Sequence, residues 1–337
     1  MMERWLLAVI VAAVTAGAVT RLTEIVARRR SLLDVPNERS SHVTPTPRIG
    51  GLGIAAGAIA GWLAAGGPSD PIGAIVVVAG AALGAVGLAD DLWSTSVLGK
   101  YLAQLTASAV VAIAIAPSLR LAIGSAALTI DGPAAIVLAT LALTALVNAV
   151  NFMDGIDGLV GGVSVAVAVV AIAVAGAQGW PLAVPLAAAC AGFLAWNWAP
   201  ASIFMGDVGS HFLGLMLGAL LLMRPEGSVE VVPALIVVSP LLFDTGFTLL
   251  RRARARQDVF AGHREHLYQR VVQAGASHRA VAAGYVGATL VAGALAIVWP
   301  ALSGPGQVAG MAVLLVAGLA YGILVGRSSG LVTLAGT

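Results

Sequence analysis

Charged residues are scarce in this 337-residue chain, at 10% of the sequence, where soluble domains carry about 25%. Cysteine occurs once, at Cys190 inside an apolar run, which excludes disulfide bonds within the chain. Hydrophobic residues instead reach 59%, and the mean hydropathy is +0.96. These proportions exclude a soluble globular domain and indicate an all-α, polytopic integral membrane protein.

Apolar windows long enough to cross a bilayer, about 17–25 residues, predict eleven transmembrane helices, or ten if the weak window 50–66 is not one. They fall near 5–26, 50–66, 71–89, 101–117, 133–149, 159–177, 181–199, 209–223, 231–250, 281–299 and 307–326. The first window also resembles a signal peptide with a cleavage site at Ala16-Gly17-Ala18. Its length and the following Arg28–Arg30 favour an uncleaved helix. We expect a single membrane-embedded domain over residues 1–337.

Basic residues are distributed unevenly between alternate loops. One set of loops carries fourteen of the eighteen Lys and Arg residues. This set comprises 26–49, 90–100, 150–158, 200–208, 251–280 and the tail after 326. The positive-inside rule places these loops in the cytoplasm, with the N-terminus outside and the C-terminus inside, in the inner (plasma) membrane of a bacterium. The lipid bilayer is the expected partner, and the net charge of +2 implies no patch for nucleic acid.

Polar residues gather in short islands within these loops. The islands are Ala89-Asp90-Asp91, the stretch Asn148-Ala-Val-Asn151-Phe-Met-Asp154-Gly-Ile-Asp157-Gly158, and Phe204-Met-Gly-Asp207-Val-Gly-Ser210. Polar side chains at a membrane boundary cost several kcal/mol unless they face water, protein or an ion. Carboxylates at several helix ends therefore predict one shared metal–phosphate site on the cytoplasmic face.

These islands, with two more segments, resemble the polyprenyl-phosphate N-acetylhexosamine-1-phosphate transferase superfamily. This superfamily includes the phospho-N-acetylmuramoyl-pentapeptide translocase and the WecA-type initiating transferases. The matching segments are, in order, Asp34-Val-Pro36-Asn37-Glu-Arg39-Ser-Ser-His42 with Pro45-Thr-Pro47-Arg48-Ile-Gly50-Gly51, then Ala89-Asp90-Asp91, Asn148 to Leu159, Phe204 to Ser210, and His263-Arg-Glu-His266-Leu-Tyr268-Gln-Arg270. The ordered combination is specific, whereas a single Asp-Asp pair is common.

The resemblance implies an Mg²⁺-dependent enzyme, with Mn²⁺ as a substitute ion. It would transfer HexNAc-1-phosphate from a UDP-N-acetylhexosamine to undecaprenyl phosphate, giving undecaprenyl-diphospho-HexNAc and UMP. This reaction is the first membrane step in making O-antigen, capsule or wall polymers. A transporter of a phosphorylated or nucleotide substrate is the alternative, but it should show repeated halves, and no internal repeat is visible. A homodimer is compatible with the family.

The acidic islands receive roles by resemblance. Asp207 is implied as a metal ligand, Asp91 as a residue near the metal, and Asp90 as the base or a lipid-phosphate contact. From the residues alone, a helix that begins at Gly206 offers free N–H groups to phosphate, and a cation would offset the charge of Asp207. The alternatives are Asp207 as a simple N-cap and Asp90-Asp91 as a solvated helix cap.

Asn151, Asp154 and Asp157 are spaced by three residues, so on a helical turn they share one face. A glycine-rich turn with polar caps is the alternative. The resemblance implies that this segment contacts the nucleotide and the diphosphate, with Asp154 catalytic and Asp157 at the uridine. Asn148 and Asn151 belong to the substrate-binding set, and Asn148 is expected to orient its neighbours.

Three further substrate contacts are expected. Phe204 is implied to stack on the uracil ring, and a lipid-facing aromatic is the alternative. His42 and Arg48 lie in a first loop that its prolines keep extended. They are assigned to the nucleotide-sugar pocket or to lipid entry, against the alternative of a plain surface loop.

The loop 251–280 carries a basic run, Arg251–Arg256, which is typical of a topology anchor. Its later part is assigned by resemblance to the diphosphate and the sugar. In this part His263 and His266 are implied to be catalytic, and Arg264 and Arg270 to bind substrate. Two His at i, i+3 with Glu265 could instead bind zinc. Asp244, in the preceding helix, resembles another acid of the family. It is expected to pair with Arg251 or Arg252 rather than to touch the substrate, which is the alternative. The form His263-Arg-Glu-His266-Leu-Tyr-Gln269 departs from the usual Asp-Arg-x-His-x-His-His and resembles an O-antigen or capsule branch.

The chemistry follows from charge. A phosphate monoester with a second pKa of about 6 is mostly dianionic at neutral pH, so the lipid phosphate needs little help from a general base. We therefore expect direct attack on the β-phosphorus rather than a covalent aspartyl route.

Overall fold

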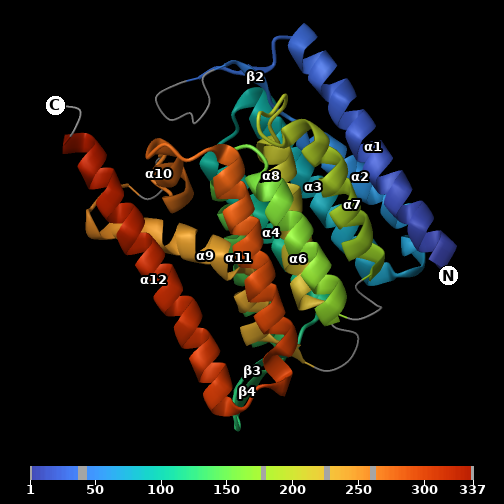
Figure 1. Cartoon of the computed structure of the whole chain (residues 1–337). Coiled ribbons are helices and arrows are strands. Elements are labelled where there is room, and N and C mark those ends of the chain that lie inside the picture. The colour runs from blue at the N-terminus through green and yellow to red at the C-terminus, as the bar shows by residue number, and fades with distance from the viewer. Residues whose placement is uncertain (1, 37–43, 176–179, 224–227, 259–262, 335–337) are drawn as a thin grey trace.

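Helices form almost all of the computed structural model, which describes residues 2–36, 44–175, 180–223, 228–258 and 263–334 (Figure 1). The apolar helices are α1 (Met2–Arg29), α2 (Gly51–Ala64), α3 (Pro71–Trp93), α4 (Val97–Ile115), α5 (Gly132–Met153), α6 (Leu159–Ala175), α7 (Trp180–Asn197), α8 (Gly206–Leu222), α9 (Val231–Arg254), α11 (His278–Val298) and α12 (Gly304–Leu334). The short ones are α10 (Leu267–Gln273), η1 (Gly67–Ser69) and η3 (Trp299–Ala301).

These helices fall on the predicted windows. Within the described residues, eight helices are long and apolar enough to cross a membrane, and α2, α6 and α8 are shorter apolar helices. Side chains on the outer helices are both apolar and exposed, as Leu6 on α1 (61%) and Val313 on α12 (65%) show. Such surfaces are stable in lipid and costly in water. The polytopic, helical membrane class is confirmed.

Helix α8 is the innermost helix of the bundle. Its side chains from Val208 to Leu221 are all buried, and it packs against α2, α3, α5 and α6. A helix that is apolar on every side is stable in this way only when other apolar elements surround it. Its N-terminus therefore lies inside the group of helix ends that surrounds it.

A glycine contact sets how closely α2 approaches α8. Gly51 lies so near Gly209 that a Cβ on Gly51 would overlap the Gly209 backbone. Small residues at helix contacts allow such approach. The loop before α2 is joined to the segment before α8 as well, since the amides of Gly50 and Gly51 donate to the carbonyls of Phe204 (2.9 Å) and Met205 (2.8 Å).

Two small sheets were not predicted. β1 (Leu33–Asp34) pairs antiparallel with β2 (Thr46–Pro47). β3 (Leu119–Ile123) and β4 (Ala126–Ile130) form a hairpin, and β5 (Val229–Glu230) pairs parallel with β3. The strands lie in connections between helices, where a search for apolar windows has nothing to detect. They are an addition to the expected all-α class.

The loops predicted to be cytoplasmic lie together. Figure 1 shows β2, α10 and the C-terminal end of α1 at the upper end of the bundle and the β3–β4 hairpin at the lower end. Side-chain contacts join the end of α3 to the beginning of α4, the end of α5 to the beginning of α8, and the α5–α6 connection to the beginning of α11. The single-domain and homodimer assignments stay predictions.

Candidate active site

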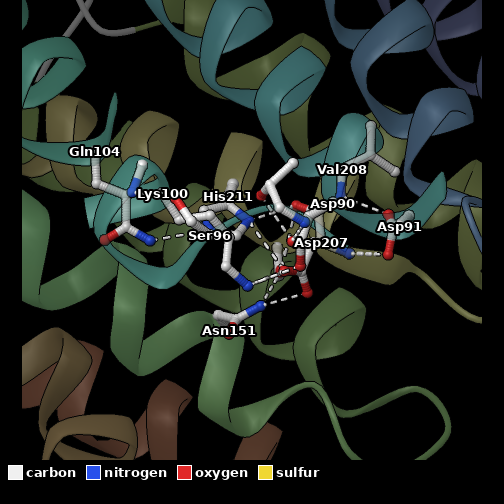
Figure 2. Close-up of polar contacts among 12 residues, drawn as sticks. Asp90, Asp91, Ser96, Lys100, Gln104, Asn151, Asp207, Val208 and His211 are labelled. Atoms are coloured by element: carbon white, nitrogen blue, oxygen red, sulfur yellow. Dashed lines mark hydrogen bonds and ion pairs between the residues drawn. The ribbon is translucent and has the colours of Figure 1, made fainter. Parts of the chain in front are cut away.

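Four helix ends meet around one carboxylate, that of Asp207 at the start of α8 (Figure 2). Asn151 of α5 donates from Nδ2 to Asp207 Oδ1 at 2.9 Å. Lys100 of α4 lies with Nζ 3.5 Å from Asp207 Oδ2 and 2.7 Å from Oδ2 of Asp90, at the end of α3. The Lys100 ammonium thus lies between two carboxylates and offsets their repulsion.

Asp91 has different surroundings from its neighbour Asp90. Its side chain is 6% exposed, and its two carboxylate oxygens accept the backbone N–H groups of Asp207 (3.1 Å) and Val208 (3.0 Å). Arg48 donates to the Asp91 backbone carbonyl. A carboxylate at a helix N-terminus satisfies unpaired donors and interacts favourably with the helix dipole. Asp91 is therefore a cap for α8, and its place near a metal stays a prediction.

This cap corrects one expectation from the sequence. The first N–H groups of α8 were expected to be free for phosphate, but two of them are bonded to Asp91. Gly206 makes the contact feasible, because its φ of 73° is in the left-handed region and a Cβ there would lie 2.7 Å from Asp91 Oδ2. The anion bound at the N-terminus of α8 is therefore the Asp91 carboxylate.

A chain of side chains supports Asp207 from inside the bundle. Gln104 Nε2 donates to His211 Nε2 at 2.9 Å, so the His211 proton lies on Nδ1 and is donated to the Asp207 backbone carbonyl at 2.8 Å. Asn148 donates to Gln104 Oε1 at 2.7 Å and to the Thr144 carbonyl at 2.8 Å. Asn148 thus orients its neighbours in this structure, and its contact with substrate stays a prediction.

Lys100, Gln104 and His211 were not singled out from the sequence. Lys100 was counted only among the loop charges. The sequence did contain a signal, because Lys100 and Gln104 are four residues apart, on one face of a helix with no other charged residue. Polar residues on such a helix usually face the bundle interior and have a function.

Asp157 is held by two elements. Its Oδ2 accepts the backbone N–H of Ala201 at 3.1 Å and lies 3.3 Å from Nδ1 of His278, at the start of α11. These contacts join the α5–α6 connection to the segment before α8 and to α11. The uridine contact expected of Asp157 stays a prediction.

Asp154 differs from Asp90, Asp91, Asp157 and Asp207, because its carboxyl group has no hydrogen-bond partner among the described residues. Its side chain is half-buried. Burial, followed by the negative charges of Asp207, Asp91 and Asp157 in that order, raises the pKa of Asp154 to about 8. Its carboxyl group is thus mostly protonated at neutral pH until a cation or a donor reaches it.

This raised pKa predicts a pH-dependent stability. Between about pH 4 and about pH 8 the folded chain keeps a proton on Asp154 that the unfolded chain has lost, so the free energy of unfolding falls as pH rises through that window. The melting temperature of the wild type in detergent with EDTA should therefore drop relative to that of Asp154→Asn across this range. Asp131→Asn, at an exposed acid at the start of α5, is the control. Parallel curves for wild type and Asp154→Asn would contradict the assignment.

The first loop and the segment before α8 carry three more predicted residues. Phe204 is half-buried, and its backbone N–H donates to the Pro47 carbonyl at 2.8 Å. This pairing places Arg48 beside Asp91. His42 lies outside the described residues. Contacts of these three residues with substrate stay predictions.

The late motif is anchored on Asp244 of α9. His266 is 3% exposed, and its Nδ1 lies 3.1 Å from Asp244 Oδ1. The expected pairing of Asp244 with an arginine was wrong. Arg251 and Arg252 both pair with Glu265 instead, at 2.9 and 3.0 Å, because the chain turns back over the end of α9 and brings Glu265 to them.

The remaining residues of this motif have distinct environments. The His263 ring stacks on His266 with centroids 5.0 Å apart. Burial, His266 and Arg252 lower the pKa of His263 to about 4 against the opposing charge of Glu265, so its ring is neutral at physiological pH. Arg264 is exposed and Arg270 is half-buried on α10. Their roles, and the catalytic roles of His263 and His266, stay predictions.

The late motif and the Asp207 cluster lie on either side of the α5 end. Tyr268 donates from its hydroxyl to the Phe152 carbonyl at 3.1 Å, and the Phe152 ring lies 6.0 Å from that of His266. Phe152 immediately follows Asn151, which bonds Asp207, and precedes Asp154 by two residues. The segment 148–157 therefore connects both groups of side chains.

A magnesium ion at this site stays a prediction. Among the described residues, no three His, Cys, Asp or Glu side chains converge as a metal site would require, and Glu265 is engaged by two arginines. Mg²⁺ needs only one or two carboxylates, with water and substrate phosphate completing its shell. Asp90 and Asp207 both pair with the Lys100 ammonium. Their carboxylate oxygens, which are hard donors, therefore already surround one positive charge.

Comparison with known proteins places this sequence in a family. Residues 74–224, which include Asp90, Lys100, Asn151 and Asp207, match the family described as glycosyl transferase family 4. The decaprenyl-phosphate N-acetylglucosaminephosphotransferase of Mycobacterium tuberculosis is 34% identical over 307 residues, which cover 80% of this chain and 76% of that protein. The chain belongs to glycosyl transferase family 4.

Two further relatives extend the comparison. The probable undecaprenyl-phosphate N-acetylglucosaminyl 1-phosphate transferase of Bacillus subtilis is 32% identical over 291 residues, covering 82% of this chain and 80% of the relative. The phospho-N-acetylmuramoyl-pentapeptide-transferase of Saccharopolyspora erythraea is 44% identical over 70 residues, 20% of this chain and 19% of that protein. The superfamily that the motifs resemble is confirmed, and this glycosyl transferase family 4 member is a multi-pass membrane protein.

Proposed function

We propose that this family 4 protein transfers HexNAc-1-phosphate from a UDP-N-acetylhexosamine to a polyprenyl phosphate and releases UMP. The observation that carries the proposal is the cluster of Asp90, Lys100, Asn151 and Asp207 at one end of a membrane-spanning bundle. A water-soluble nucleotide sugar and the headgroup of a membrane lipid can both reach such a place. Relatives named for decaprenyl and undecaprenyl phosphate support the acceptor class.

The reaction exchanges one diphosphate bond for another. An oxygen of the lipid phosphate attacks the β-phosphorus, and the bond from that phosphorus to the oxygen shared with the α-phosphate breaks. The electron pair stays on this oxygen, and UMP leaves as a phosphate monoester. No proton has to move, because the lipid phosphate is already mostly dianionic at neutral pH.

The main obstacle is repulsion between two anionic substrates. Lys100 supplies a positive charge beside Asp207, and the Asn151 amide holds that carboxylate in place from the other side. Mg²⁺, held by Asp207 with Asp90 or Asp91, would neutralise charge on the diphosphate and polarise the β-phosphoryl group. Neutral His263, with His266 next to it, can offer hydrogen bonds to phosphate or sugar without adding charge to the late motif.

The setting of the reaction is also part of the proposal. The loops that share the site carry most of the basic residues, and this supports a site on the cytoplasmic face, in the inner membrane of a bacterium. Undecaprenyl phosphate is the expected acceptor there. The product would begin a cell-surface polymer such as an O-antigen, capsule or wall polysaccharide. N-acetylglucosamine is the sugar named for the relatives, so UDP-GlcNAc is the first donor to test.

A three-component assay tests the function. The purified protein should release UMP only when undecaprenyl phosphate, a UDP-HexNAc and Mg²⁺ are all present. UDP-GlcNAc, UDP-GalNAc and the UDP forms of QuiNAc and FucNAc form the donor panel, and each lipid product is identified by its mass. UMP release without the lipid, or none with any donor, would exclude the proposed reaction.

A further inference from the structure

We infer that Asp244 is a positioning residue for His266: the carboxylate fixes the ring nitrogen that carries the proton and holds the late motif against the end of α5. The inference rests on the proposed function and goes one step beyond it. Asp244 lies in α9, outside the cluster around Asp207, and it is 1% exposed.

Five donors converge on the Asp244 carboxylate. Oδ1 accepts the Leu267 N–H at 2.9 Å and lies 3.1 Å from His266 Nδ1, with the Thr248 hydroxyl at 3.5 Å. Oδ2 accepts the Tyr268 N–H at 3.0 Å and the Tyr285 hydroxyl. Two of these donors are the first N–H groups of α10, so the carboxylate caps this short helix from a different helix. A buried carboxylate with so many donors is held in one orientation.

The contact with His266 determines which nitrogen carries the proton. A carboxylate accepts but does not donate, so His266 must place a proton on Nδ1 to bond Asp244. Nε2 is then the nitrogen that remains for substrate, and it has no partner among the described residues. A carboxylate that fixes the tautomer and orientation of a neighbouring histidine is a common way to prepare that ring for proton transfer or ligand binding.

Ring contacts hold His266 in the direction that Asp244 sets. The ring lies between His263 (5.0 Å) and Tyr268 (5.8 Å), and Phe152 lies 6.0 Å away. Tyr268 also bonds the Phe152 carbonyl. Phe152 is adjacent to Asn151, which bonds Asp207. Asp244 therefore holds the His266 ring next to the segment that reaches the Asp207 cluster.

An amide in place of the carboxylate cannot serve all five donors. Asn has one acceptor oxygen, and its NH₂ group would face N–H or O–H donors. Asp244→Asn should therefore keep nearly the same volume while losing control of the His266 tautomer. We expect kcat for UMP release to fall about 10²-fold or more, with KM for the UDP-sugar changed by less than about threefold.

A double-mutant cycle separates positioning from a merely structural role. If Asp244 acts through His266, Asp244→Asn should add less than about a twofold loss once His266 is already Ala. Losses that multiply would overturn the inference, as would a wild-type kcat for either single variant. Hydrogen exchange of the Leu267 and Tyr268 amides, which should speed up in Asp244→Asn, reports on the anchor without any catalytic assay.

Two tyrosine variants cover the case in which Asp244→Asn does not fold. Tyr285→Phe removes one donor to the carboxylate and should lower kcat severalfold through His266. Tyr321→Phe removes only the contact between the Tyr321 and Tyr285 hydroxyls at 3.3 Å and should leave kcat unchanged. Equal effects of the two would overturn the inference. If the wild type released no UMP with any donor, the proposed function would be wrong. The hydrogen-exchange rates of the Leu267 and Tyr268 amides would still test whether Asp244 holds the late motif.

Discussion

Asp207→Asn should lower UMP release by about 10³-fold while the protein remains folded. The substitution removes the charge on which Lys100 and Asn151 converge and takes away a ligand from the proposed Mg²⁺ site. Asp207 would act on the developing phosphoryl charge through the Mg²⁺ that it holds, and losing one electrostatic contact of that kind costs about 10²–10³ in rate. Initial rates at saturating UDP-sugar over a range of Mg²⁺ concentrations measure the loss.

Asp131→Asn is the matched control for this experiment. Asp131 is exposed at the start of α5, the end of that helix opposite to Asn151, and it makes no side-chain cap. The same Asp-to-Asn change there should leave the rate within about twofold, since surface substitutions seldom matter. If Asp207→Asn keeps the wild-type rate and the wild-type Mg²⁺ dependence, Asp207 is not a metal ligand.

Lys100→Met should lower kcat/KM by about 10²-fold. Lys100 is the cation that bridges Asp90 and Asp207, and without it two carboxylates repel each other and the incoming diphosphate. Charge-assisted contacts of this kind contribute more inside a partly buried site than at a surface. The rate is measured with UDP-sugar below its KM, so that loss of substrate attraction appears together with loss of turnover.

Two controls separate charge from size at this position. Lys100→Arg keeps the positive charge, though with a planar, forked head, and should stay within about tenfold of the wild type. Arg120→Met removes a cation that bonds Glu230 at 2.6 Å beside the β3–β5 pair and should leave the rate nearly unchanged. Wild-type activity in Lys100→Met would show that the ammonium has only a structural contact with the two acids.

The sequence alone determined the membrane class, where most of the apolar helices of the described residues lie, and that the acids gather at one end of the bundle. Each of these properties is local: apolar length predicts a span, and a charged residue at a span boundary predicts a functional site. The weak window 50–66 forms a short apolar helix, α2, whose Gly51 packs against Gly209, and the choice between ten and eleven transmembrane helices stays a prediction. The small sheets were not predicted, because short strands in the connections between helices give no periodic pattern in the sequence.

Only the tertiary structure decided which partner each acid contacts. Successive residues on a helix point about 100° apart, so Asp90 faces Lys100 while Asp91 faces the start of α8. No spacing rule distinguishes the two, because the partners lie on other helices. The same reason explains why Asp244 was expected beside an arginine of its own helix and instead binds His266, whose loop returns over α9. Local composition sets where polar groups occur, and packing between distant helices sets which of them touch.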